Sequence, residues 1–114
     1  MSTQSEVMHC YEQITLVTER MLLLATTGQW AALPLLELQY SETVERLRVI
    51  EPLEVLLEDQ LKRKFQLLQR ITANHANINA AVLPQLNQLG DILQSLERQQ
   101  NLHNAYSQTS DIYL

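Results

Sequence analysis

Glycine, proline, cysteine and aromatic residues are all scarce in this chain of 114 residues. It has two glycines, three prolines and one cysteine, and its aromatic residues are one Phe, one Trp and four Tyr. So few glycines and prolines leave little material for turns, which argues against a loop-rich or all-β fold. The single cysteine, Cys10, excludes an internal disulfide framework and is typical of a protein from a reducing compartment.

Excess positive charge and long apolar runs are also lacking. The net charge of -5 argues against nucleic acid or an anionic membrane as the main partner, because both require a basic surface. No apolar run reaches the roughly 18 residues that a membrane span needs. The first residues lack the basic and apolar regions of a secretory signal. We therefore expect a cytoplasmic protein that neither enters a membrane nor binds nucleic acid directly.

Residues that carry catalysis or bind metals are scattered. The histidines His9, His75 and His103 form no HxxxH or HxxE pair on one helical face. His9 and Cys10 are adjacent, so on a helix they point about 100° apart and cannot form a nucleophile–base pair. Two glycines do not suffice for a phosphate-binding loop. The sequence predicts a binding protein that is not an enzyme and that uses no metal or cofactor.

Leucine and alanine, by contrast, are abundant, and apolar residues make up 46% of the chain. Both residue types are strong helix formers, and alternating β-branched runs are absent. Apolar positions recur at steps of three, four or seven residues, which is the spacing of one helical face. The sequence predicts an all-α fold, an antiparallel helical bundle of three main helices within a single domain spanning residues 1–114.

The first helix is expected over residues 4–27. Thr3 and Glu6 have the spacing of a capping box, in which the two side chains satisfy each other's backbone amides. Gly28 suits the left-handed position that ends many helices.

The connection from Gly28 to Trp30 is short, so the second helix should run antiparallel to the first. We expect these two residues to form a structural turn, with Trp30 as a core anchor. The second helix begins either at Trp30 or, after a separate turn, at Pro34. It ends before Pro52, since the residue preceding a proline is pushed out of the helical region.

The dominant feature is an apolar stripe over residues 53–96. Its members are Leu53, Leu57, Leu61, Phe65, Leu68, Ile71, Ile78, Val82, Leu86, Leu89, Leu93 and Leu96. One unbroken helix of this length measures about 66 Å, roughly twice the length of either helix before it. Either the stretch folds back near Pro84 and Gly90, or part of its face is left for a partner. We expect one unusually long third helix, bent near Pro84, and a short C-terminal fourth helix over about residues 98–107.

Residues 71–90 contain no Asp, Glu, Lys or Arg, and their polar positions are mostly Asn and Gln. A neutral face rich in hydrogen-bonding groups resembles an interaction surface, although a plain amphipathic helix has the same pattern. A groove of leucines and similar residues can accept an amphipathic helix of a partner. The candidate groove residues are Leu61, Phe65, Leu68, Ile71, Ile78 and Val82.

Two motifs resemble those of FliT-type flagellar export chaperones. The stretch LLLATTGQWAALPLLELQY, residues 22–40, is similar to the first helical hairpin of that family. The stretch NLHNAY, residues 101–106, is similar to its SLNNAY-like C-terminal segment, from which it departs at Asn101 and His103. The spacing between the motifs also matches, so the resemblance covers essentially the whole chain.

The resemblance implies a cytoplasmic chaperone of flagellar type III export. Such proteins bind the filament-cap protein FliD, prevent its premature assembly and deliver it to the export apparatus, where FlhA and the FliI/FliJ ATPase complex are contacts. Enteric-type members also bind FlhC, a subunit of the master regulator FlhDC, and repress class 2 flagellar genes.

The resemblance further implies a core bundle of about residues 1–93 and a regulatory segment of about residues 94–114. That segment is thought to cover the binding surface. Its predicted regulatory residues are Leu102, Asn104, Ala105 and Tyr106, and Leu102 and Tyr106 are expected to plug the groove. The alternative role for both residues is ordinary capping of a four-helix core.

Two other interpretations fit the same sequence. One is a regulatory adaptor that sequesters a transcription factor and has no client for export. The other is a dimerisation module, a homodimer in which the excess stripe is buried against a second copy.

Overall fold

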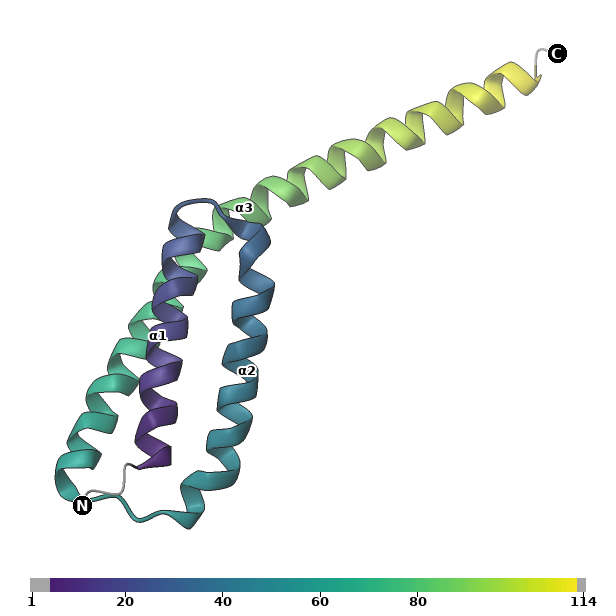
Figure 1. Ribbon diagram of the computed structural model, residues 1–114. Coiled ribbons are helices and arrows are strands. Elements are labelled where there is room, and N and C mark those ends of the chain that lie inside the picture. Colours follow the sequence, from purple (N-terminus) through teal and green to yellow (C-terminus); the bar gives the residue numbers. More distant parts are fainter. Residues whose placement is uncertain (1–4, 113–114) are drawn as a thin grey trace. The chain divides into compact units, whose positions relative to one another are not determined.

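The structure is a computed structural model that describes residues 5–112 and the side chains of residues 5–106. Its elements are α1 (Glu6–Thr26), the 3-10 turn η1 (Trp30–Ala32), α2 (Leu33–Ile50), the 3-10 turn η2 (Glu51–Leu53) and α3 (Glu58–Ile112) (Figure 1). The described residues contain no strand, so the predicted all-α class and the long third helix are confirmed. The chain divides into two units, Met1–Ala81 and Val82–Leu114, and α3 contributes to both.

The first unit is a bundle of α1, α2 and the first part of α3, in which successive helices run in opposite directions (Figure 1). Its core cluster consists of Val7, Cys10, Tyr11, Ile14, Leu47, Leu67 and Ile71. Four of these seven residues come from α1 at steps of three, one and three, which is one face of a helix. Burial of this face provides the main driving force for folding of the unit.

Helix α1 begins two residues later than the sequence predicted. Ser5 is the N-cap, and its hydroxyl oxygen accepts a hydrogen bond of 3.0 Å from the backbone amide of Met8. This is the bond by which an N-cap satisfies one of the free amides of the first turn. The predicted cap, Thr3, lies outside the described residues.

The turn after α1 agrees with the prediction. Gly28 has φ +74°, and the amide of Gln29 donates to the carbonyl of Leu24 at 2.9 Å. This six-residue closure is the Schellman motif, for which glycine is favoured. Trp30 opens the separate turn η1, and α2 begins one residue before Pro34. The predicted role of Trp30 as a core anchor is wrong, because the residue is half-buried and lies outside the core cluster.

The predicted start of the third helix at Leu53 is wrong. Residues 54–57 are not helical, Glu54 has the extended angles φ -121° and ψ 133°, and α3 begins at Glu58. The side chain of Gln60 accepts a hydrogen bond of 2.8 Å from the amide of Leu57, which is the second half of a capping box. Leu53 and Leu57 are therefore exposed residues of a connection.

The predicted fourth helix is also wrong for the described residues. Residues 98–107 belong to α3, which continues through Pro84 and Gly90 to Ile112. Proline and glycine weaken a helix without necessarily ending it, and no further proline or glycine follows Gly90. The bend near Pro84 stays a prediction.

Candidate functional site

The predicted groove residues lie in three different environments. They are Leu61, Phe65, Leu68, Ile71, Ile78 and Val82. Ile71 and Ile78 are buried in the first unit, whereas Leu61 and Phe65 are 40% and 62% exposed. The other two are half-buried. The six residues do not form one exposed surface.

The buried face of α3 shares Ile71 and Ile78 with the predicted row but also includes Leu67 and Asn74, which the prediction left out. It consists of Leu67, Ile71, Asn74 and Ile78, at steps of four, three and four residues. Leu67 is fully buried, and sequence reasoning missed it because the parallel row through Phe65 is equally apolar. The buried row contains one polar residue, Asn74, whose side chain bonds to a buried side chain of α1. Asn74 is therefore the signal in the sequence that distinguishes the buried row from the row through Phe65.

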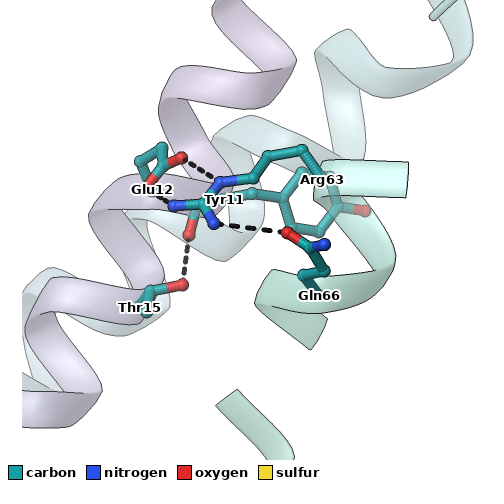
Figure 2. A network of polar contacts seen from close by, with 5 residues as sticks. All are labelled: Tyr11, Glu12, Thr15, Arg63 and Gln66. Carbon is teal, nitrogen blue, oxygen red and sulfur yellow. Dashed lines mark hydrogen bonds and ion pairs between the residues drawn. The ribbon is translucent and has the colours of Figure 1, made fainter. Parts of the chain in front are cut away.

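Ion pairs attach α3 to α1 along the edge of this buried face. The guanidinium of Arg63 contacts the carboxylate of Glu12, with 3.0 Å from Nε to Oε1, and also reaches the side chain of Gln66 at 3.5 Å (Figure 2). Seven residues further along both helices, Arg70 pairs with Glu19. The equal spacing keeps the two helices in register, although exposed pairs of this kind add little stability.

A polar cluster joins α1, η2 and α3 near the start of α3. The Tyr11 hydroxyl donates to the carboxylate of Glu51, and Lys64 Nζ lies 3.1 Å from Glu51 Oε1 and 5.4 Å from the centroid of the Tyr11 ring. Burial, then the hydrogen bond to Glu51 and its charge, raises the pKa of Tyr11. Burial by itself would raise the pKa of Glu51, but the hydrogen bonds from Tyr11 and Lys64 and the lysine charge together lower it.

Both pKa shifts keep these groups in their ordinary charge states at neutral pH. The Glu51 carboxylate stays ionised and the Tyr11 phenol stays protonated, so neither is poised to transfer a proton. The cluster therefore fastens the connection between α2 and α3 and has no catalytic geometry.

The second unit presents an apolar row of a different kind. Leu83, Leu86, Leu89, Ile92, Leu93 and Leu96 are each between 49% and 57% exposed. Four of them, Leu86, Leu89, Leu93 and Leu96, are spaced by three or four residues and share one face of α3, which we call the leucine row. Contiguous exposed apolar surface of this kind marks an interaction site. The leucine row is the best candidate for a binding surface in this protein.

The predicted regulatory residues lie in the same helix, after the leucine row. Leu102 and Tyr106 are 58% and 71% exposed, and Asn104 and Ala105 are exposed as well. Leu102 follows Leu93 by nine residues, which places it about 180° around a continuous helix. While α3 remains continuous, Leu102 and the leucine row lie on opposite faces of it.

Metal sites and membrane-spanning helices are both absent from the part of the chain that the structure describes. The described residues contain no group of three or more His, Cys, Asp or Glu side chains placed to hold a metal ion. None of the helices, as far as they are described, combines the length and hydropathy that crossing a bilayer requires.

Comparison with known proteins gives consistent matches. The family model described as "Flagellar protein FliT" matches residues 8–108. The flagellar protein FliT of Yersinia enterocolitica is 34% identical over 104 residues, which cover 89% of this chain and 84% of the relative, and that of Yersinia pestis is 31% identical over the same shares. The crystal structure of flagellar protein FliT from Bordetella bronchiseptica is 39% identical with a TM-score of 0.71, covering 77% of this chain and 99% of that one. The chain therefore belongs to the FliT family of flagellar proteins, which are not enzymes.

Proposed function

We propose that this protein is a cytoplasmic chaperone of flagellar type III export that binds the filament-cap protein FliD. In this role it prevents premature assembly of FliD and delivers it to the export apparatus. Membership of the FliT family supports the proposal. The observation that carries it is the leucine row, four exposed leucines on one face of a continuous helix.

The chemistry of the leucine row indicates what it binds. An amphipathic helix with apolar residues at i, i+3, i+4 and i+7 is complementary to a row of this spacing. Residues 82–106 contain only three acidic or basic residues, Asp91, Glu97 and Arg98. Few charges must therefore be desolvated on binding, and apolar burial provides most of the affinity. We infer that the client segment is an apolar helix from the C-terminal region of FliD.

Calorimetric titration with purified FliD tests this directly. Leu93→Glu inserts a charge into the leucine row and should weaken binding at least about tenfold, since one buried unpaired charge costs more than 1.4 kcal/mol. Gln88→Glu is the matched control because it adds the same charge to an exposed position off the row. Equal affinities of the two variants would refute the leucine row as the client site.

We further propose that the C-terminal segment, about residues 94–114, regulates access to this surface. Because Leu102 lies opposite the leucine row on a continuous helix, the helix must open after Leu96 before Leu102 and Tyr106 can cover the row. The affinity for FliD is then reduced by the fraction of molecules in the covered form.

Removal of residues 98–114, a cut that keeps Leu96 and so leaves the leucine row complete, tests the regulatory role. The shortened chain should stay folded, because the core cluster lies in the first unit, and should bind FliD more tightly than the full chain. Unchanged affinity of a folded shortened chain would contradict regulation by this segment.

We propose that the leucine row also binds the other partners, each at a different time. These are FlhA and the FliI/FliJ complex during delivery, and FlhC when the protein acts against FlhDC and represses class 2 flagellar genes. If FliD and FlhC share the leucine row, they compete, and excess FliD should displace FlhC from the immobilised protein. Capture of FlhC without any binding of FliD would favour the regulatory adaptor over the chaperone.

A further inference from the structure

Trp30 is the only tryptophan of the chain, and the packing of the core does not account for it. It is half-buried in the turn between α1 and α2. A Cβ at Gly28 would lie 4.0 Å from its indole nitrogen, so the ring lies beside the turn that ends α1. Among the described residues, no second ring and no cationic side chain contacts the indole. Tryptophan in such a position is typical of an anchor for a partner, since it is enriched among the residues that dominate binding energy.

An open hollow lies at the same end of α1, within the first unit. Its volume is about 570 Å³, and it is lined by Glu19, Leu22, Leu23, Thr26 and Asn77, which we call the α1-end hollow. Its four α1 residues are spaced by three, one and three, so they share one helical face. On α3, the neighbours of Asn77 at steps of four and three residues are Ala73 and Ala80, whose short side chains leave this space open.

The surroundings of the α1-end hollow favour an apolar occupant. Residues 21–36 contain no Asp, Glu, Lys or Arg, and the side chain of Leu23 is 61% exposed. The one ionised residue of the lining, Glu19, is already paired with Arg70. An apolar side chain that packs against Leu22 and Leu23 therefore removes water from apolar surface without desolvating an unpaired charge.

The end of α1 also favours a positive charge. The carbonyl end of a helix carries a partial negative charge, but α1 has no basic residue in its last turn. The hydroxyls of Thr26 and Thr27 donate to carbonyls of this turn at 2.9 and 2.8 Å, and these neutral groups leave the partial charge uncompensated. Trp30 lies at the same end, and the face of an indole attracts cations more strongly than any other aromatic side chain. A lysine or arginine of a partner would satisfy both groups.

We propose that the end of α1 is a docking site for a protein segment that combines apolar side chains with one basic residue. The apolar side chains fill the α1-end hollow against Leu22 and Leu23. The lysine or arginine lies between the last carbonyls of α1 and the indole of Trp30. The site uses only residues of the first unit, so it is separate from the leucine row and does not depend on the function proposed for that row.

Binding of three synthetic helical peptides to the full chain tests this site. The first carries leucines at i, i+3 and i+4 and a lysine at i+7, one turn further on. The second has glutamate in place of the lysine, and the third has serine in place of the leucines. Because Trp30 is the only tryptophan, its fluorescence reports contact at this site. We expect the first peptide to change the emission saturably, and the other two to bind at least about tenfold more weakly.

A pair of variants locates the bound peptide. Leu23→Lys places a like charge in the α1-end hollow and should weaken binding of the lysine peptide at least about tenfold. Leu38→Lys, at a leucine of α2 that is 55% exposed, adds the same charge outside the hollow and should keep the original affinity. Trp30→Phe retains an apolar ring but attracts cations less strongly, so calorimetry should show weaker binding. Thermal melts of all three variants check that they are folded.

Four results would overturn the proposal. The first is no saturable binding of the lysine peptide at millimolar concentration, and the second is equal affinity for the lysine and glutamate peptides. The third is binding that is lost in Leu93→Glu but kept in Leu23→Lys, because the peptide would then occupy the leucine row. The fourth is weaker binding of FliD by Leu23→Lys, which would make the hollow part of the client site. FliD binding that fails in every variant would refute the proposed function alone and leave the peptide results standing.

Discussion

Asn74 of α3 donates a hydrogen bond of 3.0 Å to the hydroxyl oxygen of Thr18 in α1, and both side chains are buried. The Thr18 hydroxyl in turn donates to the carbonyl of Thr15 at 2.9 Å. One hydroxyl therefore acts as acceptor and donor, and every buried side-chain polar atom among the described residues has a partner. Among the described residues, this is the one hydrogen bond between two side chains that is buried, and it joins α3 to α1.

We expect Thr18→Val to lower the free energy of unfolding by about 1–3 kcal/mol, because it leaves the buried Asn74 amide without its acceptor. The double variant with Asn74→Leu removes both polar partners and should lose less than the sum of the two single changes. Urea denaturation of the four proteins measures the coupling. Additive losses would show that the hydrogen bond does not determine the interface.

Leu67 provides the test of which face of α3 is buried. It is fully buried in the core cluster, so Leu67→Ala should cost about 2–5 kcal/mol of stability. Leu93→Ala removes the same atoms from a residue that is 57% exposed, and its effect on stability should stay within about 0.5 kcal/mol. Chemical denaturation compares the two. A similar loss in both would mean that Leu93 is also covered in solution.

The buried row of α3 through Leu67 and the exposed row through Phe65 show how far the sequence alone can predict the packing of this helix. Leu67 and Phe65 belong to rows with the same helical spacing, so periodicity predicts a helix but does not choose its buried face. That choice is made by residues distant in sequence. Thr18 accepts from Asn74, and Glu12 pairs with Arg63, and both α1 residues are more than 50 positions away from their partners.

The start of α3 was missed for a related reason, whereas the turn at Gly28 was predicted correctly. The turn depends on local chemistry, a glycine at a left-handed position after an apolar helix end. The connection between α2 and α3 depends on Glu51 and Glu54, which accept hydrogen bonds from Tyr11 and Ser5, 40 and 49 positions earlier in the sequence. Local pattern does not reveal such contacts, so the spacing of the nearby leucines predicts a helix that begins at Leu53.

The two glycines should respond to alanine in opposite ways. Gly28→Ala forces an L-residue to φ +74° and should lower stability by about 1–2 kcal/mol. Gly90 lies inside α3, and a Cβ there meets no atom within 4 Å, so Gly90→Ala should raise helicity, with a gain of about 1 kcal/mol. Circular dichroism during thermal melting measures both. A loss of helicity in Gly90→Ala would indicate that the bend predicted near Pro84 needs this glycine.

The acid sensitivity of the fold should depend on Glu51. The hydrogen bonds from Tyr11 and Lys64 outweigh burial and hold its pKa below the ordinary value, which is about 4.3 in an unfolded chain. A carboxyl group whose pKa is lowered by folding contributes stability that is complete above the unfolded pKa and is lost as the pH falls through the folded pKa.

We therefore expect the melting temperature to fall as the pH is lowered from about 5 toward 3, and to fall less steeply in Glu51→Gln. The variant keeps an acceptor for Tyr11 but cannot lose a charge, so its stability should be lower at neutral pH and should approach that of the unchanged protein in acid. Glu37→Gln, at an exposed position of α2, is the control and should retain the full slope. Identical slopes for Glu51→Gln and the unchanged protein would show that the cluster with Tyr11 and Lys64 does not stabilise the ionised carboxylate.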